Sequence, residues 1–86
     1  MSKIEKLIAW MMTVPKNMPV ADLDRIMAHF GYVRDNGNGG SGVKYRRLSD
    51  GSIANFHLPH RANTEHAIPT YVIRQIIEEL KKRGDL

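Results

Sequence analysis

Residues 43–58 read VKYRRLSDGSIANFHL, in which two segments of alternating apolar and polar residues flank Asp50-Gly51. Asp-Gly between such segments is a strong signal for a β-hairpin with a two-residue type I′ turn, because both central positions require positive φ. The turn predicts that Ser49 pairs with Ser52, which fixes the register of the two strands. This stretch therefore predicts an antiparallel hairpin at the centre of the chain.

Side-chain alternation sorts the hairpin residues onto two faces. One face is apolar and is expected to cover the core, although Arg47 interrupts it near the turn. The other face is basic and polar, with Leu48 and Ile53 as apolar exceptions, and the register places Lys44 opposite His57. The core-face residues are Val43, Tyr45, Ala54, Phe56 and Leu58, and the polar-face residues are Lys44, Arg46, Asn55 and His57.

Three segments outside the hairpin, residues 2–13, 20–31 and 70–83, carry apolar residues at helical spacing. The first begins with a Ser-x-x-Glu capping box. A short strand is expected at residues 32–34. This order predicts an α+β fold, α-α-β-β-β-α, in which helices cover one face of a three-stranded antiparallel sheet. A chain of 86 residues is too short for two cores, so residues 1–86 are expected to form a single domain.

The composition excludes several classes of protein. The chain has no cysteine, which rules out a disulfide-stapled scaffold, a thiol nucleophile and a thiolate zinc site. No apolar run is long enough to cross a bilayer, and the first residues lack a signal-peptide pattern. We therefore expect a cytoplasmic location and no membrane partner.

The charge of the chain favours a polyanionic partner. Thirteen Lys and Arg against nine Asp and Glu give a net charge of +4, which is high for so small a domain. The excess is central, where Lys44, Arg46, Arg47 and Arg61 stand against Asp50 alone. On charge alone, a basic structural domain without a nucleic-acid partner stays open.

Two further motifs admit more than one explanation. Residues 37–42 read GNGGSG, which lacks the Gly-Lys-Ser/Thr ending of a P-loop, so a flexible hairpin connection and a weak phosphate cradle both stay open. His57 and His60 are three residues apart, point in different directions near a strand end and have no carboxylate close in sequence. We expect no metal site and no small-molecule cofactor.

Several short motifs follow one another along the chain in a distinctive order. They are Gly31-Tyr32, Gly40-Ser41 before Val43-Lys44-Tyr45, His57-Leu58-Pro59-His60, and Ile68-Pro69 before Val72-Ile73-Arg74-Gln75-Ile76. Their order and spacing, more than any single motif, resemble the HicA toxins over a core of residues 20–83. Residues 1–18 resemble the N-terminal helical extension of longer members.

The resemblance implies a fold like that of double-stranded-RNA-binding domains and a metal-independent endoribonuclease that cleaves messenger RNA and is neutralised by a HicB antitoxin. In the family a Gly-Ser-His pattern supplies the catalytic histidine, whereas this chain has Gly40-Ser41-Gly42. In the predicted register, position 42 lies opposite Pro59, on the polar face and diagonally near His57. An imidazole there could act as a general acid or base. Glycine cannot, so impaired cleavage is expected.

Three explanations of Gly42 stay open: an introduced substitution, a natural loss in a protein that only binds RNA or antitoxin, and chemistry transferred to His57. The alternative function is a non-catalytic RNA-binding or antitoxin-binding module of the same fold. Tyr45 alternates to the core side, so RNA binding is expected mainly through phosphate contacts. The expected RNA-binding residues are Gly40, Ser41, Lys44, Arg46, Arg47 and His60.

Overall fold

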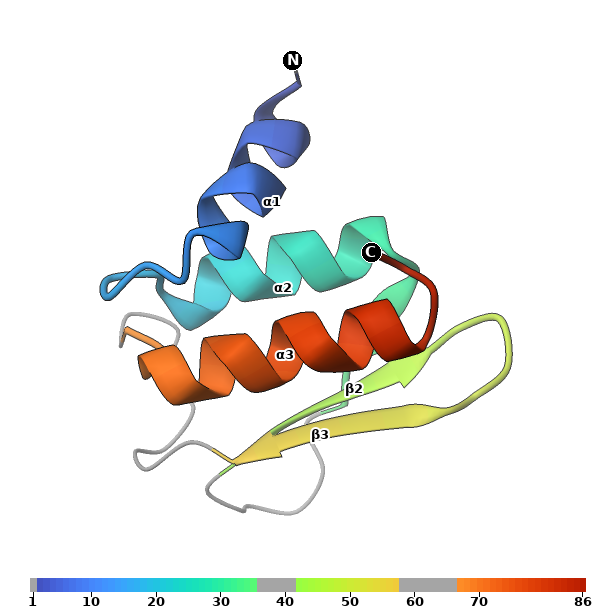
Figure 1. Ribbon diagram of the computed structural model, residues 1–86. Helices are drawn as coiled ribbons and strands as arrows, with labels where there is room; N and C mark the ends of the chain where they lie inside the picture. Colours follow the sequence, from blue (N-terminus) through green and yellow to red (C-terminus); the bar gives the residue numbers. More distant parts are fainter. Residues whose placement is uncertain (1, 36–41, 58–66) are drawn as a thin grey trace.

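The computed structural model describes residues 2–35, 42–57 and 67–86, and this part of the chain forms three helices and a three-stranded sheet (Figure 1). The predicted α+β class and the order α-α-β-β-β-α, which is like that of double-stranded-RNA-binding domains, are confirmed. The elements are α1 (Lys3–Met12), α2 (Val20–His29), β1 (Tyr32–Arg34), β2 (Gly42–Arg47), β3 (Ile53–His57) and α3 (Thr70–Lys82).

The sheet has the strand order β1-β2-β3 with antiparallel neighbours, so β2 lies in the middle and β1 and β3 form the two edges. Helices α2 and α3 lie on one face of the sheet, with α2 packed against β1 and α3 against β3 (Figure 1). Helix α1 packs against α2, and its N-terminal end extends away from the sheet. No helix of the described residues covers the opposite face.

The helices begin and end where local sequence signals place them. Ser2 Oγ accepts a hydrogen bond from Glu5 N at 3.2 Å, which confirms the predicted N-terminal cap of α1. Gly31 follows α2 with a φ of +86°, a left-handed conformation that ends the helix. Ile68 N donates to Met18 O at 2.8 Å, which ties the start of α3 to the start of α2. No helix in the described ranges is long and apolar enough to cross a bilayer.

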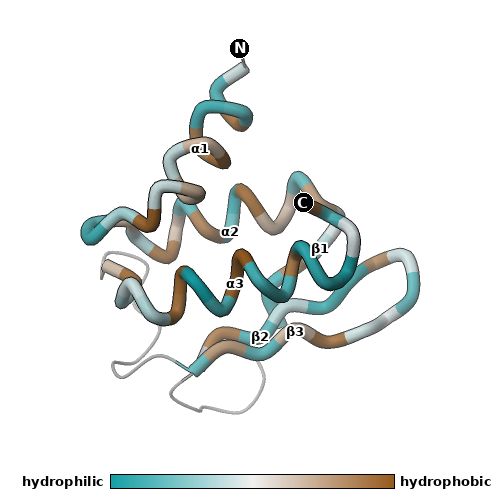
Figure 2. Tube along the Cα trace, in the orientation of Figure 1, coloured by the Kyte–Doolittle hydropathy of each residue, from teal (hydrophilic) through white to brown (hydrophobic). Residues whose placement is uncertain are grey.

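The core lies between the sheet and the helices and is filled by apolar side chains from all six elements. Figure 2 shows hydrophobic and hydrophilic residues alternating along the helices and strands. Met11 of α1 and Met18 are fully buried, so the N-terminal segment shares this core with the rest of the chain. The buried hydroxyl of Tyr45 donates to Asp24 Oδ1 on α2 at 2.6 Å. Burial, together with this carboxylate, raises the pKa of Tyr45 well above its usual range.

The prediction of a two-residue type I′ turn is wrong, because the hairpin loop is longer. Arg47 N donates to Ser52 O at 2.8 Å and Gly51 N donates to Arg47 O at 2.8 Å, so the loop comprises the four residues between Arg47 and Ser52. Gly51 does have the predicted positive φ, at +72°. Leu48 N donates to Gly31 O at 2.9 Å, so pairing with the segment before β1 holds Leu48 away from β3.

The register of β2 with β3 differs by two residues from the prediction as a consequence. Gly42 lies opposite His57, whereas the predicted register places Lys44 opposite His57. A shift by an even number of residues leaves every side chain on its predicted face, because side chains alternate with a period of two. The core face is accordingly confirmed for the described residues Val43, Tyr45, Ala54 and Phe56, which are all buried. Leu58 lies outside the described residues.

Candidate nucleic-acid interface

The face of the sheet opposite the helices, called the outer face below, is built by alternate residues of the three strands. Strand pairing places Val33, Arg46 and Ile53 in one row across the sheet, and Lys44 beside Asn55 in the next row. These five side chains are exposed. The outer face comprises Val33, Gly42, Lys44, Arg46, Ile53, Asn55 and His57.

Lys44 and Arg46 form the basic part of the outer face. They alternate on β2, so their Cα atoms lie about 6.6 Å apart along the strand. Both side chains are exposed, and neither has an ion pair within the described part of the chain. Asp35 N donates to Lys44 O at 2.7 Å, which continues the pairing of β1 beyond its last residue. The two cations are accordingly available to phosphate oxygens.

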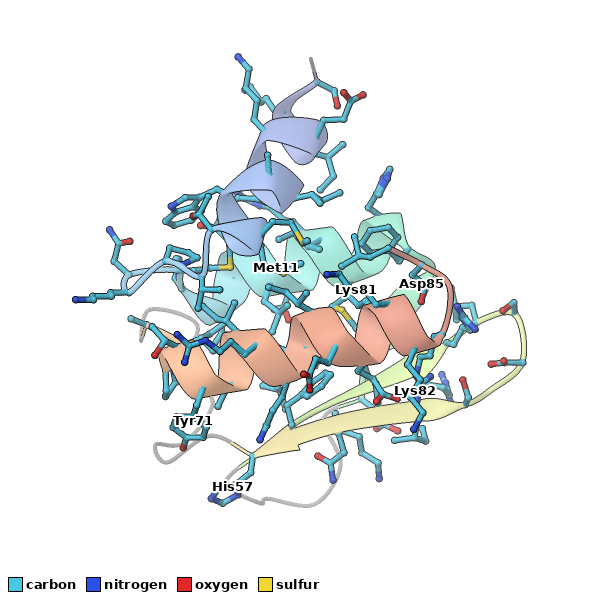
Figure 3. The ribbon with its side chains drawn as sticks, viewed as in Figure 1. Met11, His57, Tyr71, Lys81, Lys82 and Asp85 are labelled. Carbon is cyan, nitrogen blue, oxygen red and sulfur yellow. The ribbon has the colours of Figure 1, made fainter. Side chains whose placement is uncertain are left out.

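Gly42 and His57 are direct cross-strand partners at one end of the outer face. This pairing corrects the predicted diagonal relationship, in which Pro59, now outside the described residues, lies opposite position 42. Directly opposite residues have Cβ atoms about 4.5–5.5 Å apart. The His57 side chain is exposed at the end of β3 (Figure 3). A histidine at position 42 would therefore stand beside His57, one row from Lys44.

Arg47 does not join Lys44 and Arg46, because it lies on the opposite side of β2. Its Nη2 donates to Asp85 Oδ1 at 2.6 Å, and its Nη1 lies 3.7 Å from Asp50 Oδ2. The hydrogen bond to Asp85 raises the pKa of the Arg47 guanidinium. Its guanidinium carbon lies 5.3 Å from the ring centroid of Tyr32. These contacts tie Arg47 to the C-terminal end of the chain and give it a structural role.

The other predicted site residues, Gly40, Ser41 and His60, lie outside the described residues. Within residues 2–35, 42–57 and 67–86, no three His, Cys, Asp or Glu side chains gather where they could hold a metal ion. The structure therefore brings together Gly42, Lys44, Arg46 and His57 of the predicted set.

An apolar cluster on the outer face was not predicted as a unit. Val33 and Ile53, which are 37% and 40% exposed, lie on either side of Arg46 and form this cluster, and Leu48 in the adjoining turn is 65% exposed. The sequence identifies Leu48 and Ile53 as exceptions on a polar face, but the position of Val33 depends on the β1–β2 register, which no local motif encodes.

No family model, curated protein or solved structure matches this chain. The fold and the outer face define the class directly. The chain is a small α+β domain with an element order like that of double-stranded-RNA-binding domains and with an exposed basic sheet face.

Proposed function

We propose that the chain is a HicA-like toxin domain of the cytoplasm. Toxins of this type are metal-independent endoribonucleases that act on messenger RNA and are neutralised by a HicB antitoxin. Cleavage by this chain is impaired because Gly42 stands at the position of the family's catalytic histidine. One observation carries the proposal: Gly42 pairs with His57 on the same face as the exposed Lys44 and Arg46. One imidazole at position 42 would complete a site of two histidines and two cations.

The proposed chemistry is attack of a ribose 2′-oxygen on the adjacent phosphorus. A general base takes the proton of the 2′-hydroxyl, the bond from phosphorus to the 5′-oxygen breaks, and a general acid protonates the leaving oxygen. The products are a 2′,3′-cyclic phosphate and a 5′-hydroxyl. Lys44 and Arg46 would stabilise the phosphate charge during this step. With glycine at position 42, His57 is the one imidazole among the described residues of the outer face, although the reaction needs two proton transfers.

The second candidate function is a non-catalytic module that binds RNA or the antitoxin. The apolar cluster of Val33 and Ile53 supports it, because apolar side chains contribute little to phosphate binding but suit a protein surface. Arg46 at the centre of this cluster would attract a carboxylate of such a partner. In this function the outer face is shared, with one end for phosphates and the other for protein.

Restoring the histidine tests the first candidate. We expect Gly42→His to cleave a labelled messenger RNA in EDTA about 100- to 10,000-fold faster than the unmodified chain, the usual contribution of general acid-base catalysis. Gly42→Asn is the matched control, because it adds a polar side chain that cannot exchange protons near neutral pH. If both variants bind RNA with equal affinity and neither cleaves it, the endoribonuclease is rejected and the non-catalytic binding module is favoured. If no form of the chain binds RNA, both RNA functions are rejected.

A further inference from the structure

Strand β3 presents backbone hydrogen-bonding groups at an edge of the sheet where no other strand of the described residues pairs with it. Ser52 O accepts from Arg47 N, so Ser52 faces β2, and in an antiparallel ladder the backbone groups of Ile53 and Asn55 then point away from β2. Arg83 Nη2 donates to Ile53 O at 2.8 Å from this outer side, which agrees with that direction. The N–H and C=O of Asn55 have no partner among the described residues.

A groove runs between this edge and α3. Its volume is about 350 Å³. Arg83, just after the C-terminal end of α3, bonds the first residue of β3, so helix and strand run in opposite directions along the groove (Figure 1). The groove is lined by Asn55, Phe56, Gln75, Glu78, Glu79 and Lys82. An exposed strand edge beside a helix is a geometry that accepts an added peptide strand.

The charged side chains of the groove define a pattern. Glu79 Oε1 already accepts from Arg83 Nε at 2.7 Å, whereas Glu78 and Lys82 are exposed and have no ion pair within the described ranges. Glu78 and Lys82 are four residues apart on α3, a rise of about 6 Å. In an extended strand, residues i and i+2 lie about 6.6 Å apart and point to the same side. The two charges therefore match the side-chain repeat of a strand.

We propose that the groove between β3 and α3 binds an extended peptide segment of another protein, which adds antiparallel to β3 through the backbone of Asn55. Because such a segment runs in the direction of α3, it carries a basic residue facing Glu78 and, two residues later, an acidic residue facing Lys82. The alternating residues are apolar and lie beside Ile53 on the outer side. This site is independent of the proposed RNA function and uses none of its cations.

A second copy of the chain fits the groove less well than such a segment. Its own strand, Ile53–His57, reads IANFH and offers no carboxylate or ammonium to Glu78 and Lys82. Edge-to-edge pairing of two copies would therefore leave both groove charges without partners. The charge pattern selects a foreign segment of the form basic-x-acidic.

Amide hydrogen exchange with a blocked peptide, Thr-Val-Lys-Val-Glu-Val-Thr, tests the proposal on the intact chain. In the free protein we expect the Asn55 amide to exchange much faster than the amides of Ala54 and Phe56, which face β2. Saturating peptide should slow exchange at Asn55 at least tenfold. If Asn55 does not respond, the proposal is wrong. If Asn55 becomes protected with rising protein concentration and no peptide, self-pairing replaces it.

Variants test the edge and the charges separately. Asn55→Pro removes the N–H at an edge position where proline is tolerated, and should weaken the peptide at least tenfold, whereas Asn55→Ala keeps the N–H and should bind normally. The reversed peptide, Thr-Val-Glu-Val-Lys-Val-Thr, should bind about threefold more weakly, in line with exposed ion pairs. Exchanging the charges with Glu78→Lys and Lys82→Glu together should invert that preference. If the preference between the two peptides does not change, the assignment of the charge pattern is wrong. Lys44→Ala is the control on the outer face and should leave peptide binding unaltered.

Discussion

Arg46 and Arg47 are neighbours in sequence and opposites in structure. Arg46 lies on the outer face, is exposed and has no ion pair among the described residues. Arg47 lies on the inner face, the side of the sheet that the helices cover, where its side chain is 20% exposed and binds the carboxylate of Asp85 over the ring of Tyr32. One residue of strand alternation therefore separates a cation available to ligands from a cation used by the fold.

The difference between the two faces shows how a strand can divide a run of basic residues. The inner face meets the C-terminal end of the chain, where Asp85 accepts from both Arg47 and the Tyr32 hydroxyl, and where Arg83 bonds Glu79, Ser52 and Ile53. The outer face meets no helix of the described residues. Local charge density alone therefore overestimates the number of cations that RNA could contact.

The largest change in stability is expected from Asp85→Ala, which removes the acceptor on the inner face. The buried Tyr32 hydroxyl would lose its partner, at a cost of about 2 kcal/mol. The melting temperature should fall by roughly 8–16 °C in thermal unfolding followed by circular dichroism. Glu78→Ala is the matched control because Glu78 is exposed, and it should change the unfolding free energy by less than about 0.5 kcal/mol. Equal effects of the two variants would contradict the role of Asp85.

The inner face also predicts a loss of stability at high pH. Burial and the hydrogen bond to Asp24 raise the pKa of Tyr45 in the folded state above its unfolded value of about 10. Its contribution is complete below pH 10 and is lost as the pH rises towards the folded pKa, by up to about 1.4 kcal/mol per pH unit. Urea unfolding between pH 9 and 11 measures this slope.

Two tyrosine variants separate this effect from general alkaline unfolding. Tyr45→Phe should reduce the slope of the unfolding free energy against pH by up to about 1.4 kcal/mol per pH unit, the equivalent of one proton, because phenylalanine has no hydroxyl to ionise. Tyr71→Phe is the control, since Tyr71 is half exposed on α3, and it should leave the slope unchanged. An unaltered slope in Tyr45→Phe would show that another group is responsible.

A smaller loss of stability is expected from a substitution in the turn that connects β2 to β3. Gly51 has a φ of +72°, and no atom lies within 4 Å of a Cβ added there, so Gly51→Ala costs backbone strain alone, about 1 kcal/mol. Ser49→Ala, in the same exposed loop, should change the unfolding free energy by less than about 0.5 kcal/mol. Urea midpoints measure both, and a neutral Gly51→Ala would contradict the left-handed turn.

Sequence alternation predicts the two faces of β2 and β3 correctly, although the predicted turn is wrong. The loop is longer by two residues, an even number, so Val43 and Tyr45 stay on the core face. The register itself could not be read from Asp50-Gly51, because the competing bond between Leu48 and Gly31 depends on a strand that pairs from elsewhere in the chain.

The partners of Arg47 could not be predicted from its neighbours. Asp85 is 38 residues away and is placed by the end of α3, so no local spacing indicates the ion pair. The exposed row of Val33, Arg46 and Ile53 likewise depends on two strand pairings at once. The polar-face pattern of Lys44, Arg46 and His57 was visible because it lies within one hairpin.

RNA titration of Arg46→Ala and Arg47→Ala, at a temperature where both are folded, tests the division of the two faces most directly. We expect Arg46→Ala to lower RNA affinity about fivefold and to reduce the slope of log affinity against log salt by about 0.7, with little change in melting temperature. Arg47→Ala should lower the melting temperature and leave RNA affinity and salt slope unchanged. Loss of RNA binding in Arg47→Ala, or none in Arg46→Ala, would contradict it.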